Sequence, residues 1–184
     1  GNIRWVFSIK DYIRFRLTGQ ALSERTDLSG SGLMDVKNGC VDPGLLSALG
    51  IGEAADWIAP LCSSFDLCGQ ITPEAAALTG LCPGTPVAGG MFDIDACALA
   101  MDVTSPDQLC TITGTWSINE FISPQPKLHT QVAMNSLYAI PGYYLLEECS
   151  PTSAGNLEWV LGQLSACLNL PQGSSPYDTV NQLV

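Results

Sequence analysis

The residue with the strongest chemical signature is Asp93, which follows a glycine pair and opens a stretch of small residues. Gly89 and Gly90 let the backbone turn sharply or let a ligand approach closely. The residues before them predict a short buried strand, and the alanines after Asp93 predict a helix. A carboxylate at such a turn faces the kind of crevice where α/β proteins place their sites. Two roles stay open from these residues alone, a helix N-cap and a catalytic acid or base.

A second candidate site is the turn Thr113-Gly114-Thr115, between segments that alternate as strands do. A tight turn of this kind can present backbone N–H groups and hydroxyls to an anion such as phosphate. The same residues are also common in hairpins that bind nothing. Turn chemistry therefore remains the alternative.

Composition narrows the class of protein. The chain has 184 residues, 46% hydrophobic and 14% charged, which fits one globular domain or parts of two. A net charge of −11 makes nucleic acid an unfavourable partner. No apolar run has the length of a membrane span, and the start shows no secretory leader. We therefore expect a cytoplasmic protein without nucleic acid or membrane partners.

The cysteines point to the same compartment. None of the 8 cysteines lies in a CxxC pair, and several lie within apolar runs, where cysteine behaves as a small buried hydrophobe. These features predict reduced thiols rather than disulfides. His129 is the only histidine, so a zinc site containing histidine is poorly supplied and we predict no metal ligands.

The first helix predicted is 9–18, with Ser8 as its cap and Gly19 beyond its end. Helical spacing predicts that its apolar residues are buried, namely Ile9, Tyr12, Ile13 and Leu17. Its basic residues, Lys10, Arg14 and Arg16, predict a solvated face, with a phosphate patch as the alternative.

Further along, the pattern alternates between helices and strands. Capping residues predict short helices at 43–49 and after Thr72-Pro73-Glu74. A turn cluster at 104–107 predicts a domain boundary. After it, we expect strands at 108–122, 132–140 and 143–148, then a helix at 153–168. The buried stripe predicted for that helix is Leu157, Val160, Leu161 and Leu164.

The order of five segments gives the chain a family resemblance. They are Lys10-Asp11-Tyr12 with Leu17-Thr18-Gly19, the stretch 26–33, the stretch 84–90 with Asp93, Gly114-Thr115, and Leu146-Glu147 leading to Leu157-Glu158-Trp159. In this order they resemble the FGGY family of carbohydrate kinases. The bacterial L-xylulose kinase type looks most similar, around Met91-Phe92-Asp93, Gly114-Thr115-Trp116 and 150–159.

The resemblance implies an α/β fold of the actin-like, ribonuclease-H-like kind, with two domains and a cleft. The chain would form the middle of such a kinase. Residues 1–105 would be the end of the sugar-binding N-terminal domain, and residues 106–184 the start of the ATP-binding domain.

The resemblance also implies a reaction and its residues. Asp93 matches the base that takes the proton from a sugar hydroxyl as that hydroxyl attacks the γ-phosphate of ATP, and Phe92 beside it would contact the sugar. Gly114 and Thr115 match a turn that holds ATP phosphates. Ala154 and Glu158 match nucleotide contacts that are glycine and glutamine in glycerol kinase. ATP and Mg²⁺ are the implied cofactors, and a ketopentose such as L-xylulose, or a related ketose or polyol, is the implied substrate.

The family's phosphate loop and adenine loop do not match any part of this chain. We therefore expect that the 184-residue chain alone does not turn over, although a complete parent protein would. One alternative is a truncated or degenerate member that acts as a binding or structural module. Another, with little support, is an unrelated α/β enzyme that uses Asp93 with Asp95. The oligomeric state stays open, a homodimer included.

Overall fold

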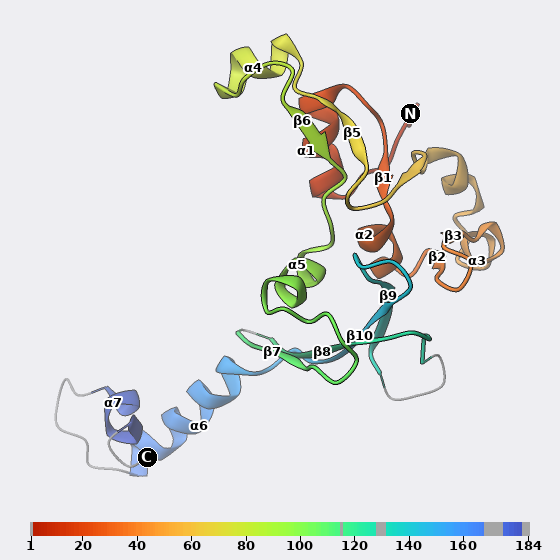
Figure 1. Ribbon diagram of the computed structural model, residues 1–184. Helices are drawn as coiled ribbons and strands as arrows, with labels where there is room; N and C mark the ends of the chain where they lie inside the picture. Colours follow the sequence, from red (N-terminus) through yellow and green to blue (C-terminus); the bar gives the residue numbers. More distant parts are fainter. Residues whose placement is uncertain (1, 115, 128–131, 168–174, 182–184) are drawn as a thin grey trace. The chain divides into compact units, whose positions relative to one another are not determined.

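The computed structural model describes residues 2–114, 116–127, 132–167 and 175–181 (Figure 1). Contacts along the chain separate two compact units. The larger comprises residues 1–110 and 120–147, and the smaller comprises 111–119 and 148–184. None of the helices within the described residues is long and apolar enough to cross a bilayer.

The first helix, α1 (Ile9–Thr18), has the predicted bounds. The Ser8 hydroxyl accepts the N–H of Asp11, and Gly19 ends the helix at φ 72°. Its predicted buried face is wrong for Ile9, Tyr12 and Ile13, which are exposed, whereas Leu17 is half-buried. The buried residues of α1 are Asp11, Arg14 and Thr18, whose polar groups bond to neighbouring backbone and to one another.

Helix α2 (Arg25–Gly30) follows the short strand β1 (Ser23–Glu24), which pairs in parallel with β4 (Leu61–Cys62). The N-cap is Glu24, whose carboxylate accepts the N–H groups of Thr26 and Asp27. Glutamate is not among the favoured N-cap residues. The helix was therefore not visible in the local sequence pattern.

Several peripheral elements have the capping residues expected of them. Asp42 is the N-cap of helix α3 (Pro43–Ala48), and helix α4 (Pro73–Thr79) has Thr72 as its N-cap and Gly80 as its C-cap. Between α2 and α4 lie the paired strands β2 (Met34–Asp35) and β3 (Cys40–Val41), and the 3₁₀ helix η1 (Gly52–Trp57).

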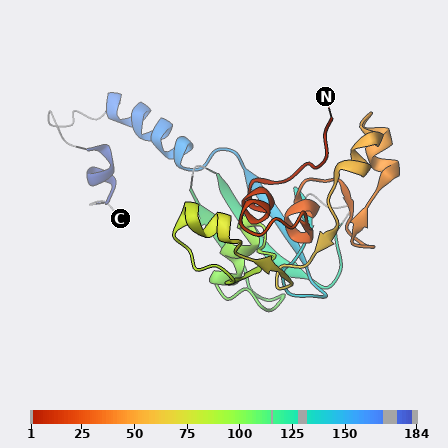
Figure 2. The same cartoon turned by 90° about the horizontal axis from the view of Figure 1, so that it is seen from above.

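The strand before Asp93 is β6 (Pro86–Ala88), which pairs antiparallel with β5 (Leu67–Gln70). Both views show the chain passing from β6 into α5 (Asp93–Ala100) (Figures 1 and 2). This strand–turn–helix order is the one predicted from the glycine pair. The predicted burial of the strand is wrong, because Pro86 and Ala88 are exposed and Val87 is only half-buried.

A four-stranded sheet follows in the order β7-β8-β10-β9. Its strands are β7 (Cys110–Thr113), β8 (Ser117–Ser123), β9 (Met134–Leu137) and β10 (Tyr144–Ser150). Strands β9 and β10 are antiparallel, with Ser136 opposite Leu145. In the larger unit the sheet contributes Ile122, Leu145 and Leu146 to the core, and α2 packs against β9. The predicted strands are confirmed.

The smaller unit contains helices α6 (Ala154–Cys167) and α7 (Pro176–Asn181). Helix α6 lies where the sequence predicts it. Of its predicted buried stripe, Leu161 is buried, whereas Leu157 and Val160 are exposed. The side chain of Leu164 lies outside the described residues.

The turn before α5 depends on a glycine at position 89. A Cβ there would lie 2.2 Å from the carbonyl oxygen of Ser63, which is backbone and cannot rotate away. We expect Gly89→Ala to lower the free energy of unfolding by about 1–3 kcal/mol. Gly162→Ala, whose Cβ would have no heavy atom within 4 Å, is the control and should not destabilise the chain. Urea unfolding of both variants and the wild type measures the effect. Equal free energies of unfolding for Gly89→Ala and the wild type would contradict the expected clash with the Ser63 carbonyl.

Candidate functional site

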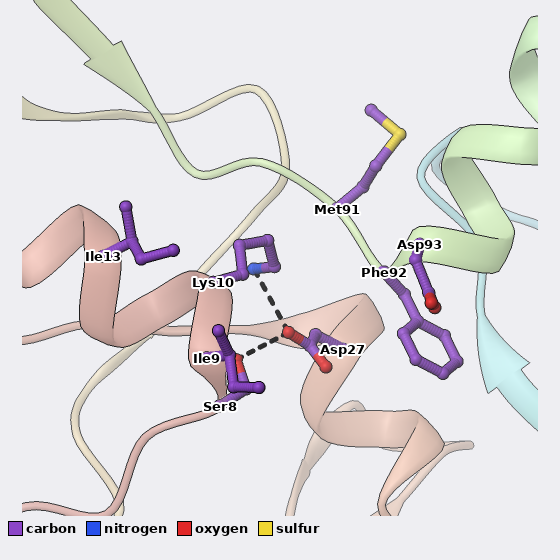
Figure 3. A pocket seen from close by; sticks show the side chains of 8 residues that line it. All are labelled: Ser8, Ile9, Lys10, Ile13, Asp27, Met91, Phe92 and Asp93. Atoms are coloured by element: carbon purple, nitrogen blue, oxygen red, sulfur yellow. Dashed lines mark hydrogen bonds and ion pairs between the residues drawn. The ribbon is translucent and has the colours of Figure 1, made fainter.

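A cavity of about 430 Å³ lies beside the start of α5. Figure 3 shows the side chains that line it, which come from α1, α2 and the segment entering α5. They are Ser8, Ile9, Lys10, Ile13, Asp27, Met91, Phe92 and Asp93. Apolar walls with a few polar groups are typical of sites for small ligands.

Asp93 is the first residue of α5 and its side chain is exposed to the cavity. The N-cap of α5 is the preceding residue, Phe92, so the alternative that Asp93 is the N-cap is wrong. One carboxylate oxygen of Asp93, Oδ1, accepts the N–H of Ile94 at 2.9 Å. The free N–H groups at a helix start favour a negative charge there. Asp93 is therefore a held carboxylate that a ligand can reach.

Phe92 lies beside Asp93 in the cavity wall (Figure 3). Its ring packs so closely on α2 that a Cβ at Gly30 would lie 2.8 Å from ring atom Cε1. Its N–H donates to Thr26 Oγ1 at 2.8 Å. The ring position is therefore set by α2, as the predicted contact with a substrate would require.

The opposite wall carries Lys10 and Asp27 (Figure 3). Ser8 donates its hydroxyl proton to Asp27 at 2.6 Å, and Lys10 Nζ lies 3.5 Å from the same carboxylate. Lys10 Nζ also lies 2.8 Å from Asp11 and 3.6 Å from Glu24. This ammonium group is thus shared by three carboxylates.

The predicted solvated basic face of α1 is wrong for two of its three residues. Arg14 is buried and pairs with Asp11 at 2.9 Å, and Lys10 is held as described above. Arg16 is exposed and lies over the ring of Tyr12. Contacts outside the helix decide the difference: Lys10 lies near Glu24 and Asp27, and Arg14 donates to the carbonyls of Gly89 and Leu22.

The segment that leads to Asp93 forms hydrogen bonds with the surrounding structure at Gly89, Gly90 and Phe92. Arg14 donates to the carbonyl of Gly89, whose own N–H donates to Asp66 O at 3.0 Å. The N–H of Gly90 donates to Ser64 O at 3.0 Å. These contacts, with the bond from Phe92 to Thr26, fix the path of the chain into α5.

Three further carboxyl groups of the larger unit are buried, those of Asp95, Glu120 and Glu147. Asp95 Oδ1 accepts the N–H of Ala139 at 2.8 Å, but Oδ2 makes no hydrogen bond among the described residues. Burial, reinforced by neighbouring carboxylates, raises the pKa of Asp95 to about 8 and that of Glu147 to about 8. Burial also raises the pKa of Glu120. Asp95 is absent from the cavity wall, so pairing it with Asp93 has no structural support.

The residues predicted to contact the nucleotide fall in the smaller unit. Gly114 and Ala154 lie together, because the Ala154 N–H donates to Gly114 O at 3.2 Å. Ala154 begins α6, and Glu158 follows one turn later with its side chain exposed. Thr115 lies outside the described residues. A turn packed at a helix start is a suitable arrangement for phosphate.

The thiols of the described cysteines are free. Cys62, Cys68 and Cys110 are buried, and burial raises the pKa of Cys62 to about 12 and that of Cys110 to about 11. Such thiols are poor nucleophiles. Within the part of the chain that the structure describes, no group of three His, Cys, Asp or Glu side chains could hold a metal ion.

Comparison with known proteins identifies the family. Residues 1–100 match the model of the N-terminal domain of the FGGY family of carbohydrate kinases. The chain belongs to this family. The N-terminal FGGY match covers the segment that carries the cavity and Asp93.

Relatives and solved structures agree with the FGGY assignment. The chain is 38% identical over 83% of its length to a probable L-xylulose kinase of Pasteurella multocida, of which it covers 32%. It is 36% identical over its whole length to L-xylulose/3-keto-L-gulonate kinase of Escherichia coli, of which it covers 35%. It superimposes on a xylulose kinase from Rhodospirillum rubrum with a TM-score of 0.84 at 26% identity, covering 98% of this chain and 36% of that one.

These matches confirm the predicted fold class, the actin-like, ribonuclease-H-like architecture of FGGY sugar kinases. The chain spans about a third of the length of these relatives. Lys10, Asp27 and Thr26 belong to segments that carry the family resemblance. However, only the fold reveals that Lys10 and Asp27 line the same cavity as Asp93, and that Thr26 bonds to the residue before it, Phe92.

The buried acids predict an unusual dependence of stability on pH. A carboxyl with a raised pKa keeps its proton to about pH 8 in the folded chain, as for Asp95, whereas the unfolded chain releases it near pH 4. The free energy of unfolding should therefore fall as the pH rises through this window, by about 2 kcal/mol or more between pH 5 and 8. Asp95→Asn keeps the acceptor for Ala139 and should make the profile shallower, with Glu147 contributing the remaining slope.

Urea unfolding across this pH range measures the effect. The control is Asp56→Asn, because Asp56 is exposed in η1. Parallel profiles for the wild type and Asp95→Asn would show that the Asp95 carboxyl is ionised in the folded chain.

Proposed function

We propose that the complete protein containing this chain is an ATP-dependent carbohydrate kinase that phosphorylates a hydroxyl of a ketopentose such as L-xylulose, or of a related ketose or polyol. The observation that carries the proposal is the placement of Asp93 in the wall of a 430 Å³ cavity, within a segment that matches the FGGY N-terminal domain. The names of the relatives from P. multocida and E. coli suggest the sugar class.

In the proposed reaction, Asp93 is the base. Its carboxylate accepts the proton of the sugar hydroxyl while that oxygen forms a bond to the γ-phosphorus of ATP. The bond from that phosphorus to the bridging oxygen breaks, and ADP leaves. Phe92 and Met91 would pack against the sugar and exclude water. Because the Asp93 carboxylate is exposed at the start of α5, a sugar bound in the cavity can place its hydroxyl against this carboxylate.

For the nucleotide, we propose that the Gly114-Thr115 turn and the start of α6 receive phosphate oxygens. The packing of Gly114 against Ala154 supports this. Glu158, one turn into α6, would contact a part of the nucleotide beyond these phosphates. Mg²⁺ bound with ATP would neutralise phosphate charge. We also assign 1–105 to the sugar-binding domain and 106–184 to the start of the ATP-binding domain, and we place the enzyme in the cytoplasm. A homodimer remains a prediction.

The base assignment predicts a large loss of rate in Asp93→Asn. In the complete enzyme, general-base loss should lower kcat about 10²- to 10⁴-fold while the fold is retained. ADP release with L-xylulose and Mg-ATP measures it, and Asp56→Asn is the matched control outside the cavity. A kcat within threefold of the wild type would exclude Asp93 as the base. A complete protein without ATP-dependent activity on any ketose or polyol would leave the non-catalytic binding module as the explanation.

The charges around the cavity favour a neutral sugar. Lys10 and Arg14 are opposed by the carboxylates of Asp11, Glu24 and Asp27, and Asp93 adds a further negative charge. Lys10 is thus already compensated and attracts an anionic sugar only weakly. The E. coli relative is named for both a neutral ketose and a sugar acid.

We therefore expect kcat/KM for L-xylulose to exceed that for 3-keto-L-gulonate in the complete enzyme. Asp27→Asn removes one negative charge that opposes Lys10. It should therefore lower the ratio of kcat/KM for L-xylulose to kcat/KM for 3-keto-L-gulonate about tenfold. Steady-state kinetics on both sugars tests this, with Asp56→Asn as control. A wild-type preference for the sugar acid would contradict the charge argument.

A further inference from the structure

We propose that Thr26 is a positioning residue, which fixes where α5 begins and thereby holds the Asp93 carboxylate in the cavity. The inference rests on the proposed role of Asp93. Its structural half, the dependence of the α5 start on the Thr26 hydroxyl, can be tested apart from that role.

Helix α5 lacks a cap of its own. Its N-cap residue is Phe92, whose side chain makes no capping hydrogen bond. Instead, the Phe92 N–H donates to Thr26 Oγ1 at 2.8 Å, across 66 residues of sequence. The start of α5 is therefore anchored by a hydroxyl from α2.

The Thr26 hydroxyl is itself fixed. Its proton is donated to Glu24 Oε2 at 2.7 Å, so the oxygen lone pairs face Phe92. Thr26 is 3% exposed and Glu24 is 0% exposed. Since both side chains are buried, their polar groups depend on protein partners.

Glu24 connects to the same segment by a second route. Its Oε1 accepts the hydroxyl proton of Ser64 at 2.9 Å, and Ser64 O accepts the N–H of Gly90 at 3.0 Å. The two routes hold the chain on either side of Met91. The backbone N–H of Glu24 donates to Asp11 Oδ2 at 2.9 Å, which ties the arrangement to α1.

The consequence for Asp93 is geometric. Asp93 directly follows Phe92, and its Oδ1 accepts the N–H of Ile94 at the α5 start. If the Phe92 anchor is lost, the first turn of α5 loosens and the carboxylate loses its fixed direction. A proton acceptor misplaced by about 1 Å can lower a rate about 100-fold. Substrate affinity depends on the whole cavity, so KM should change less than kcat.

Thr26→Val keeps the side-chain shape and removes the hydroxyl. In the 184-residue chain, amide hydrogen exchange followed by NMR should show the Phe92 and Ile94 amides losing protection at least tenfold. Thr26→Ser restores the hydroxyl and should restore protection. Ser29→Ala is the matched control. Ser29 is a buried hydroxyl of the same helix, but its partners are Thr26 O and the Leu137 N–H. It should lower stability without selective exchange at Phe92.

In the complete enzyme, Thr26→Val should lower kcat about 10- to 100-fold with KM within about threefold. Thr26→Ser should recover most of that loss. Ser64→Ala keeps the Thr26–Phe92 bond and the Ser64 carbonyl that accepts the Gly90 N–H, and removes only the hydroxyl that anchors residue 64 to Glu24. It should therefore have the smaller effect on kcat. If Thr26→Val does not fold, Ser64→Ala provides the test, because a residue 64 no longer anchored to Glu24 should raise exchange at Gly90 while Phe92 stays protected.

The outcomes separate the two proposals. Unchanged exchange at Phe92 and Ile94 in Thr26→Val overturns the positioning role whatever the enzyme does. The same holds if Ser64→Ala exposes Phe92 as fully as Gly90. Selective exchange with unchanged kcat in an active enzyme also overturns it. If the complete protein has no kinase activity, the proposed function fails, and selective loss at Phe92 and Ile94 still supports the anchoring of α5 by Thr26.

Discussion

The structure around the cavity depends on one buried carboxylate, that of Glu24. A fully buried charge is costly unless it is paired and hydrogen-bonded. Glu24 meets this requirement by capping α2, accepting the hydroxyl protons of Thr26 and Ser64, and lying near Lys10. These partners come from three parts of the larger unit, namely α2, the segment after β4 and α1. The carboxylate therefore fixes their relative positions and makes removal of any one partner expensive.

The same network sets the character of the candidate site. Because Lys10 is compensated by carboxylates, it stiffens the wall rather than offering a free positive charge. The apolar side chains Ile9 and Ile13, exposed on α1, then become lining residues together with Met91. An apolar wall with few, well-held polar groups suits a neutral ligand with several hydroxyls. Asp93 is the accessible carboxylate from which the proposed chemistry would start.

The buried acids on α5 and in the four-stranded sheet are accommodated differently. Asp95 and Glu147 lack cationic partners among the described residues, and burial raises their pKa instead. The fold thus holds carboxyl groups in two states within one unit. Those near Lys10 and Arg14 form ion pairs, whereas Asp95 on α5 and Glu147 on β10 have raised pKa values that favour the protonated form.

Local sequence determined the ends of α1, the entry to α5 and the family of the protein. Helix α1 has its predicted ends because a serine cap and a terminal glycine act within one turn, and the glycine pair before Asp93 marks the entry to α5 for the same local reason. The ordered motifs also identified the family. Tertiary structure decided the rest. Most of the predicted buried stripe of α1 is exposed, because hydrogen bonds to residues outside the helix bury Asp11 and Arg14 instead. Likewise, the bond between Thr26 and Phe92 joins residues 66 positions apart. No periodicity or spacing encodes such a contact, since it exists only once β1, α2 and α5 have packed.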